Sequence, residues 1–297
     1  MSIDIMMPFY GDVAYAKRAV DSVLAQTSSD FHLTILDDAY PDPAARELFS
    51  RIASQNESVT YHRHAENVGI LANFQQALDH AQRDWIVIMG GDDVMKPNYV
   101  EKVLELAAGT EASIIQPGVE VIDSEGNLAA PLGDRIKARL RTQALKSSGT
   151  SVLSGENLAT SLMSGNWLYF PSLAWRRTAM QGHRFREGFE IVQDLALTMD
   201  VVLGGGSLQV GNDVVFQYRR HGESVSSVQA ADLRRYAEES NYFRTMATTF
   251  AERGWKRAAR AARLHWTSRV ALLSKLPAMV KSRNWQKIPR LVRIALW

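Results

Sequence analysis

The chain has 297 residues, of which 46% are hydrophobic and 22% charged, as in a globular protein, and its lack of cysteine excludes disulfide bonds, thiolate nucleophiles and cysteine-ligated zinc. The net charge of +2 conceals an asymmetry: residues 253–297 hold 12 Lys or Arg and no Asp or Glu, which leaves a net charge of −10 on residues 1–252. No apolar run approaches the ~20 residues that span a bilayer, and Met1–Asp4 lacks the basic start of a secretory signal.

Strand-like and helix-like segments alternate in the first half of the chain. Apolar runs predict strands at 3–7, 31–36, 59–62, 85–89 and 112–122. Apolar residues at helical spacing predict helices around 16–24, 48–52, 74–81 and 100–107. This alternation predicts an α/β fold, a Rossmann-like and mostly parallel sheet flanked by helices on both faces.

The second half of the chain is less regular. Residues 124–150 are polar and basic with weak patterning, and we interpret them as a long loop or mobile insert. Further on, the sequence predicts a helix at 154–163, an extended aromatic segment at 167–175, a helix at 194–203 and a strand at 208–218. From about residue 230 the pattern is helical throughout.

The strongest local signal is the acidic pair Asp92-Asp93. It follows the apolar run 85–89 and two glycines, which allow a sharp turn or the close approach of a ligand. Two adjacent carboxylates at the end of a buried strand repel each other unless a cation or hydrogen bonds compensate them. Divalent cations with phosphate oxygens are natural partners for such a pair, and a solvated turn is the alternative.

Other polar groups follow other strands of the expected sheet. Tyr10 offers an aromatic face for a nucleobase, and Asp38 can accept a hydrogen bond from a base or ribose. Ligands of open α/β sheets bind outside the carboxyl ends of the strands, so these groups and the acidic pair form one constellation. A Gly-x-Gly-x-x-Gly fingerprint after the first strand and a phosphate-binding P-loop are both missing from the sequence.

Together these segments resemble family 2 of the inverting, nucleotide-sugar-dependent glycosyltransferases, which adopt the type-A glycosyltransferase fold. The resembling segments are Met7–Tyr10, Ala19–Thr27, Leu36–Asp38, Asn67–Ile70, Gly91–Asp93, Gln193–Leu197 and Tyr218–His221 with Ser224 and Ser226. The resemblance extends from Ile3 to Ser227.

For the donor, the resemblance implies a nucleotide pocket. Pro8, Tyr10 and Asp38 would line the pocket for the base, and Asn67 and Gly69 would shape the nucleotide side of the cleft. The implied donor is a nucleoside diphosphate sugar with UDP, GDP or dTDP as its nucleotide.

For catalysis, the resemblance implies a divalent cation and a general base. Asp93 would bind Mn²⁺ or Mg²⁺ and Asp92 the ribose or sugar of the donor, while His221 lies in the segment that closes over metal and diphosphate in some relatives. Asp194 would take the proton of the acceptor hydroxyl, and Gln193 stands where relatives often carry Glu. The cation would neutralise charge on the leaving diphosphate.

The resemblance thus implies an inverting enzyme that glycosylates a glycan or polyprenyl-linked acceptor during surface-polysaccharide assembly. The expected domains are a catalytic domain at 1–227, with a nucleotide half at 1–123 and an acceptor and base half at 151–227, and a basic helical region at 228–297. A non-catalytic nucleotide- or glycan-binding module on the same fold is the main alternative. A nucleotidyltransferase is less consistent with the sequence, which has no glycine-rich triphosphate loop after the first strand.

The basic tail carries two amphipathic patterns. In 266–276 and again in 285–297, Trp and aliphatic residues fall on one helical face and Lys or Arg on the other, and four of the seven Trp lie in this tail. Such helices lie in an anionic membrane interface, which predicts a cytoplasmic protein held peripherally on the inner face of the membrane. Packing on the catalytic domain is the alternative, and no nucleic-acid motif is present.

Overall fold

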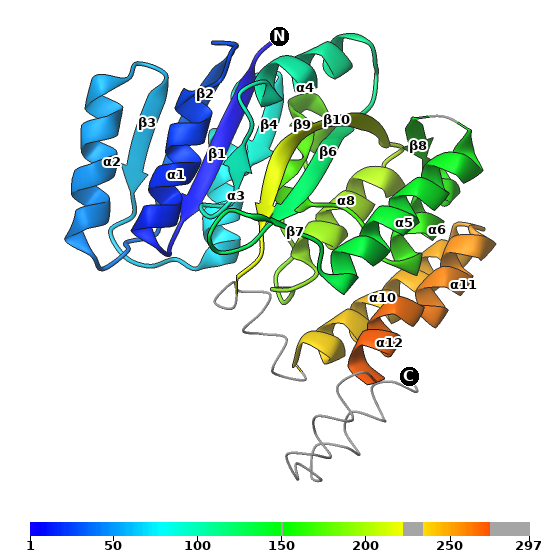
Figure 1. Ribbon diagram of the computed structural model, residues 1–297. Coiled ribbons are helices and arrows are strands. Elements are labelled where there is room, and N and C mark those ends of the chain that lie inside the picture. The colour runs from blue at the N-terminus through cyan, green and yellow to red at the C-terminus, as the bar shows by residue number, and fades with distance from the viewer. Residues whose placement is uncertain (150, 222–233, 274–297) are drawn as a thin grey trace.

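The computed structural model describes residues 1–149, 151–221 and 234–273 (Figure 1). Its strands are β1 (Ile3–Phe9), β2 (Phe31–Asp37), β3 (Val59–Arg63), β4 (Trp85–Ile88), β5 (Val94–Met95), β6 (Ile114–Ile122), β7 (Leu128–Ala129), β8 (Val152–Ser154), β9 (Ala174–Arg176) and β10 (Ser207–Arg219). Its helices are α1 (Val13–Leu24), α2 (Pro43–Gln55), α3 (Ile70–His80), α4 (Tyr99–Ala108), α5 (Leu132–Ser148), α6 (Gly155–Ser164), α7 (Arg177–Met180), α8 (Gln193–Leu203), α10 (Arg234–Glu252), α11 (Lys256–Leu264) and α12 (Trp266–Leu273), with a 3₁₀ turn η1 (Phe170–Ser172).

The strands form one mixed sheet in the order β3-β2-β1-β4-β9-β6-β10-β5, with β7 and β8 paired to β6 and β10. β1 pairs in parallel with β2 and β4, and β6 pairs in parallel with β10. β9 is antiparallel to both β4 and β6, so β6 and β10 point the same way as β1, β2 and β4. β3 is parallel to β2, so the carboxyl ends of β1, β2, β3, β4, β6 and β10 meet at one edge. The predicted α/β fold with a mostly parallel sheet is confirmed.

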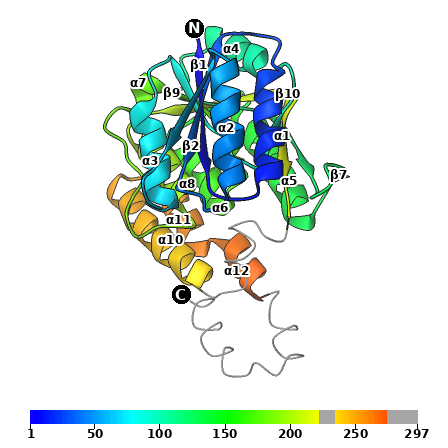
Figure 2. The same ribbon diagram turned by 90° about the vertical axis from the view of Figure 1, so that its left-hand side faces the viewer.

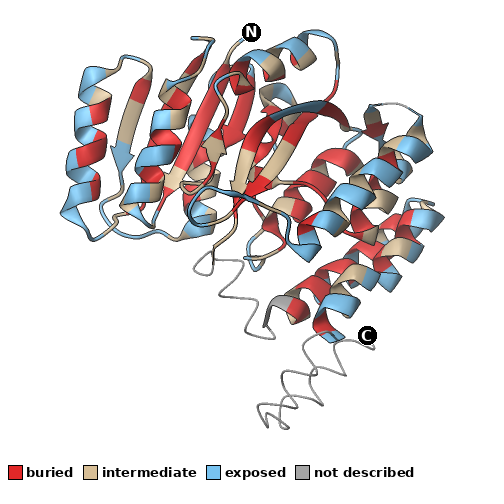
Figure 3. Cartoon of the chain, viewed as in Figure 1, coloured by how far each residue is buried: buried red, intermediate tan, exposed pale blue. Residues whose placement is uncertain are grey.

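Two hydrophobic cores lie on the two faces of this sheet. Strand β1 serves both, because its alternate residues point to opposite faces: Ile5 and Met7 pack with α1, α2 and α4, whereas Met6 packs on the opposite face with α3, α6 and α8. Figure 2 shows α1 and α2 together on one side of strands β1 and β2, with α3 on the other side. The buried strands and the buried stripes of these helices appear in red in Figure 3.

Local signals in the sequence fix several helix starts. The Asp12 carboxylate accepts a hydrogen bond from the Tyr15 backbone N–H (2.8 Å) and caps α1. Asp42 caps α2 in the same way through the Ala44 N–H, and Pro43 occupies the first helical position. These caps direct the chain from the carboxyl edge of the sheet back along its face.

The expectation of a loop or mobile insert at 124–150 was wrong. This segment holds β7 and the 17-residue helix α5, which ends at Gly149 with φ +66°. The helix gave no clear signal because only Asp134 and Ala144 on it are buried. Polar side chains dock it instead: the Lys137 ammonium donates to the Leu168 carbonyl (2.7 Å) and the Arg141 guanidinium to the Gly211 carbonyl (2.6 Å).

Two of the C-terminal helices complete one of the two hydrophobic cores. Tyr242 and Phe250 of α10 are fully buried, as are Ala258 and Ala262 of α11, which packs against α6. In Figure 1 these helices lie below α5, α6 and α8. Helices α10 and α11 therefore pack on the rest of the described chain, and the two amphipathic patterns of the basic tail begin only after them.

The next helix, α12, is more exposed. Trp266, Val270 and Leu273, which belong to the first predicted amphipathic pattern, are 45%, 57% and 44% exposed. The second pattern, at 285–297, lies outside the described residues. Within the part of the chain that the structure describes, no helix has the length and hydropathy needed to cross a bilayer.

Candidate active site

The acidic pair follows β4 at the carboxyl edge of the sheet, and its second member is fully buried. One carboxylate oxygen of Asp93, Oδ1, accepts a hydrogen bond from the Arg219 backbone N–H (2.9 Å). The other, Oδ2, is buried without a hydrogen-bond partner. Burial raises the pKa of Asp93 well above its ordinary value and the charge of Asp92 raises it further, while Arg219 opposes the shift. A buried oxygen of this kind is stabilised by a cation.

Glycine is required just before the pair. A Cβ atom on Gly90 would lie 2.7 Å from Oδ2 of Asp93 and 2.9 Å from Oδ1 of Asp92. Both distances are shorter than van der Waals contact, so any other residue would displace the carboxylates. Gly90, the first glycine of the motif, thus leaves room for both carboxylates to fold back over the turn.

Asp92 is the more accessible carboxylate and pairs with the predicted metal-side histidine. Its Oδ2 lies 2.8 Å from Nε2 of His221, and the His221 ring packs against Tyr15 with 5.3 Å between ring centroids. The Tyr15 hydroxyl donates to the Ser124 carbonyl (3.1 Å). The structure therefore brings Asp92, Asp93 and His221 together, although they come from segments almost 130 residues apart.

The residue that joins these segments is Arg219, to which the sequence analysis gave no role. Its Nε donates to the Asp92 carbonyl (2.7 Å), its Nη1 to the Asp123 carbonyl (2.9 Å), and its guanidinium lies 4.9 Å above the Tyr15 ring. Its place two residues before His221 was the available signal, since both side chains contact Asp92 and Tyr15. Arg219 thus fastens the end of β10 to the acidic turn.

We predict that Arg219→Lys lowers the free energy of unfolding by about 1–3 kcal/mol, because an ammonium cannot reproduce the planar fork and leaves partly buried carbonyls without donors. Urea denaturation of the purified variant measures this. Arg51→Lys, on the exposed side of α2, is the matched control and should stay within about 0.5 kcal/mol of the parent protein. Equal effects of the two substitutions would contradict the role given to Arg219.

The neighbouring Arg220 faces the other way and holds α5. Its guanidinium donates twice to the Asp134 carboxylate (2.9 and 3.2 Å), which also accepts a hydrogen bond from the Tyr169 hydroxyl (3.0 Å). Asp134 is buried, and these interactions tie the first turn of α5 to the end of β10. Helix α5 therefore borders the acidic site.

On the nucleotide side, Asp38 holds a loop. Its two carboxylate oxygens accept hydrogen bonds from the backbone N–H groups of Val68 (2.7 Å) and Gly69 (3.0 Å). Gly69 has φ +85°, which favours glycine, and precedes the first residue of α3. Asn67 is exposed at this loop. A carboxylate can accept about four hydrogen bonds, so Asp38 has capacity for a further one from a base or ribose. That role of Asp38 remains a prediction.

Asp37, which precedes Asp38, has a structural role. It is fully buried and accepts hydrogen bonds from the Tyr61 hydroxyl (2.6 Å), the Arg63 guanidinium (2.6 Å) and the Tyr40 backbone N–H (2.8 Å). Burial raises the pKa of Tyr61, and its bond to Asp37 adds to the shift. Asp37 and Asp38, at the end of β2, thus hold two different parts of the sheet edge. Asp37 holds the end of β3, and Asp38 holds the loop before α3.

The aromatic side chain proposed for the base is accessible. Tyr10 is 58% exposed, and its ring contacts Tyr40 edge-to-face with 5.3 Å between centroids. Pro8 is partly buried and lies opposite Leu36 in the β1–β2 ladder. The Asp38 backbone N–H donates to the Phe9 carbonyl (2.9 Å), so Pro8, Tyr10 and Asp38 lie on adjoining strand ends.

The predicted base, Asp194, lies in the first turn of α8. Its Oδ1 accepts a hydrogen bond from the Leu195 backbone N–H (2.6 Å), and the preceding Gln193 is buried with its Oε1 unpaired. A three-residue turn joins α8 to β10, the strand that ends beside the acidic pair. The role of Asp194 remains a prediction.

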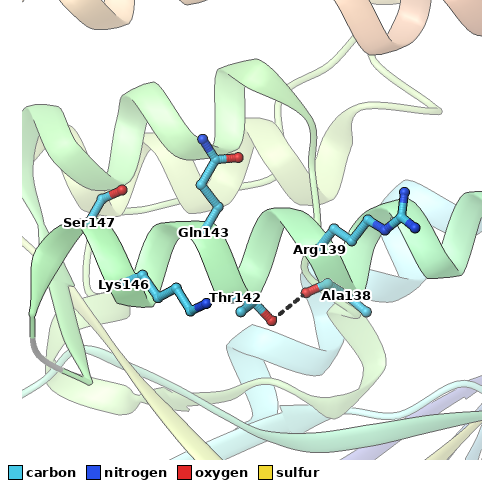
Figure 4. Close-up of a pocket in the computed structure, with 6 residues that line it drawn as sticks. All are labelled: Ala138, Arg139, Thr142, Gln143, Lys146 and Ser147. Atoms are coloured by element: carbon cyan, nitrogen blue, oxygen red, sulfur yellow. Dashed lines mark hydrogen bonds between the residues drawn. The ribbon is translucent and has the colours of Figure 1, made fainter.

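Two hollows border α5 rather than the acidic pair. The larger, of about 580 Å³, is an open groove lined by Ala138, Arg139, Thr142, Gln143, Lys146 and Ser147 (Figure 4). The smaller, of about 180 Å³, lies between α5, β6 and β10 and includes Lys137, Arg141 and Tyr169. Neither is lined by Asp92, Asp93 or Asp194.

The described residues contain no group of three or more His, Asp or Glu arranged to hold a metal by themselves. Mg²⁺ is commonly bound by one or two carboxylates together with phosphate oxygens of a substrate. The unpaired, buried Oδ2 of Asp93 fits that smaller requirement, with Asp92 beside it. The donor set is therefore suited to a cation that arrives with a diphosphate.

Comparison with known families gives this arrangement its context. The model of the family "Glycosyl transferase family 2" matches residues 4–170, more than half of the chain. The chain belongs to glycosyl transferase family 2. The resemblance inferred from the sequence is confirmed.

Curated relatives are distant and longer. An uncharacterized glycosyltransferase of Nostoc is 27% identical over 184 residues, which cover 61% of this chain and 52% of that protein. The succinoglycan biosynthesis protein ExoW of Rhizobium meliloti is 32% identical over 101 residues, 33% of this chain and 31% of that protein. Chondroitin synthase of Escherichia coli is 22% identical over 256 residues, 86% of this chain and 33% of that protein. The chain thus spans about half or less of these proteins.

Solved structures share the fold. TarS 1–349 of S. aureus in complex with UDP-GlcNAc has a TM-score of 0.61 at 14% identity and covers 82% of this chain and 66% of that chain. The mannosyltransferase PcManGT of Pyrobaculum calidifontis, in complex with GDP-Man and Mn²⁺, has a TM-score of 0.61 at 14% identity and covers 99% of this chain and 85% of that chain. At such identity these similarities establish the type-A glycosyltransferase fold alone.

Proposed function

We propose that the protein is an inverting glycosyltransferase that moves a sugar from a nucleoside diphosphate donor to a glycan or lipid-linked acceptor in polysaccharide biosynthesis. The observation that carries the proposal is the buried, unpaired Oδ2 of Asp93 beside the Asp92–His221 pair at the carboxyl edge of the sheet. Family membership supports glycosyl transfer. The names of ExoW and chondroitin synthase support a polysaccharide product, and UDP-GlcNAc and GDP-Man in the solved neighbours support a nucleotide-sugar donor.

In the proposed reaction, the acceptor oxygen attacks the anomeric carbon while the bond from that carbon to the diphosphate oxygen breaks. Asp194 receives the proton of the acceptor hydroxyl, and the nucleoside diphosphate leaves with the bonding electrons. A Mn²⁺ or Mg²⁺ ion held by Asp93 would neutralise charge on that diphosphate. A single displacement inverts the anomeric configuration and requires no covalent enzyme intermediate.

The remaining polar groups of the edge would bind and orient the donor. The exposed Tyr10 ring would stack on the base, with Pro8 and Asp38 at its sides. Asn67 and Gly69 would shape the nucleotide side of the cleft, and Asp92, held by His221, would accept hydrogen bonds from the ribose or sugar. The residues to which these roles are given all lie within the proposed catalytic domain of 1–227.

The test is a donor screen with the full-length protein. UDP-, GDP- and dTDP-sugars are incubated with Mn²⁺ and a panel of glycan and polyprenyl-phosphate acceptors, and products are detected by mass spectrometry. Turnover with one donor class that is lost on addition of EDTA supports the proposal. Calorimetric binding of a nucleotide without turnover on any acceptor would favour the non-catalytic binding module.

We propose that the basic tail holds the enzyme on an anionic membrane at the cytoplasmic face. The exposed apolar residues of α12 and the 12 Lys or Arg of 253–297, a segment without Asp or Glu, support this. Lys287→Gln, Arg290→Gln and Arg293→Gln, combined in the full-length chain, should weaken partitioning onto phosphatidylserine vesicles by about 100-fold, because each basic residue contributes roughly 1 kcal/mol. Flotation measures this, with neutral vesicles as the control. Unchanged partitioning would contradict the proposal.

Deleting everything after residue 227 is a poor test of membrane binding, because it would remove the buried Tyr242 and Phe250.

A further inference from the structure

Helix α10 contacts the segment that leads into α8. The Glu238 carboxylate accepts hydrogen bonds through a single oxygen, Oε1, from the backbone N–H groups of Ile191 (2.7 Å) and Val192 (3.0 Å). Val192 is the residue that immediately precedes α8, and its own side chain offers no hydrogen bond to the helix. The carboxylate of a distant helix thus satisfies the amides that precede the first turn of α8.

Tyr242, one turn further along α10, contacts the chain both before and after Val192. The Tyr242 ring packs edge-to-face on Phe189 with 5.5 Å between centroids, and the Tyr242 hydroxyl lies 3.4 Å from the Leu195 carbonyl. Residues 238 and 242 lie on the same face of the helix. Together they contact the chain before and after Asp194.

The face of α10 that carries Tyr242 is buried in the hydrophobic core. Tyr242, Phe243, Met246 and Phe250 are at most 4% exposed and belong to the same hydrophobic core as Leu195 and Leu197 of α8. A carboxylate at the amino end of a helix is also favoured by the helix dipole, which adds to the hydrogen bonds that Glu238 accepts. Helix α10 therefore holds Glu238 in a fixed position relative to α8.

We propose that Glu238 is a positioning residue that fixes the first turn of α8 and thereby orients the Asp194 carboxylate for proton transfer. This inference rests on the proposed function of Asp194. It makes α10, which lies beyond the segment matched by the family model, a part of the active site. Misplacement of a catalytic group by about 1 Å can cost on the order of 10²-fold in rate, so loss of this support has a measurable effect.

The test compares Glu238→Ala with Glu238→Gln in the full-length protein. Alanine removes the acceptor, and we expect kcat to fall by at least tenfold while the Kd for nucleotide with Mn²⁺ stays within about twofold. Glutamine keeps an Oε1 acceptor and should restore most of kcat. Glu252→Ala, on the exposed end of the same helix, is the matched control and should leave kcat unchanged. Glu238→Asp, which is shorter by one methylene, gives an intermediate loss if the alanine variant is too unstable to purify.

A second readout does not depend on activity. Hydrogen exchange of the Ile191 and Val192 amides should accelerate at least tenfold in Glu238→Ala relative to Glu238→Gln. Wild-type kcat in the alanine variant, or equal losses in the alanine and glutamine variants, would overturn the proposal. Absence of turnover by the parent protein with every donor would count against the proposed function, whereas unchanged amide exchange would count against the contact itself.

Discussion

Replacing Asp194 with asparagine is expected to lower kcat by about 10²–10⁴-fold, the range that general base catalysis contributes. Asparagine has nearly the same shape, and its amide oxygen can still accept the hydrogen bond that Oδ1 of Asp194 takes from the Leu195 N–H. It cannot take a proton from an acceptor hydroxyl. The KM for the nucleotide sugar should change by no more than about twofold, because the proposed donor contacts lie on other strand ends. Initial rates at saturating donor and acceptor measure the loss.

The control for this substitution is Asp21→Asn on α1. Asp21 forms an exposed, i,i+4 pair with Lys17, and such pairs contribute little to stability. The control variant should keep the parent rate and the parent Tm. Full activity in Asp194→Asn, with product of inverted configuration, would remove Asp194 as the base and require another carboxylate for that role.

Most of the fold could be predicted because its signal is local. All four residues of β4 are buried and form one apolar run, and the helices of the first half carry a buried stripe at helical spacing. The sequence predicts less well those elements that are held in place by residues far away in the chain. Helix α5 is held by polar side chains and by the Asp134–Arg220 pair, 86 residues apart, so its sequence lacks an apolar face. Strand β9 has three residues and exists because it fits between β4 and β6.

The residues of the candidate site show the same contrast between local motifs and distant contacts. Asp92, Asp93 and His221 were recognisable because the motifs around them are specific in order and spacing, and the fold brings them together. Arg219 belongs to one of these motifs, but its role could not be predicted. That role depends on the carbonyl groups of two other loops, to which its guanidinium donates. Glu238 gave no signal at all, because an isolated Glu on a helix acquires meaning only from the amides, almost 50 residues away, that it meets.

Replacing Asp93 with asparagine is expected to stabilise the free protein while abolishing metal-dependent turnover. The amide Oδ1 can still accept the hydrogen bond from the Arg219 N–H, and the variant loses a buried charge that Asp92 repels. We expect a gain on the order of 1 kcal/mol in the free energy of unfolding, or a rise of roughly 2–4 °C in Tm. At the same time the site loses its anionic ligand for the cation, so turnover with Mn²⁺ should fall below detection. Thermal unfolding and the donor assay measure the two effects.

The pH dependence gives this prediction a second check. The folded protein raises the pKa of Asp93 above its ordinary value of 3.8, so the folded state retains a proton that the unfolded state has released. The wild-type protein therefore loses stability, relative to Asp93→Asn, as the pH rises from about 4 through the raised folded value. The difference in Tm between variant and parent should thus be larger at pH 8 than at pH 4. A nucleoside diphosphate with Mn²⁺ should then raise the Tm of the parent more than that of the variant, because the variant lacks the Asp93 carboxylate that would hold the cation. A lower Tm for Asp93→Asn at pH 8 would mean that the Asp93 charge is already compensated without a cation, and the electrostatic basis for a metal at this turn would be lost.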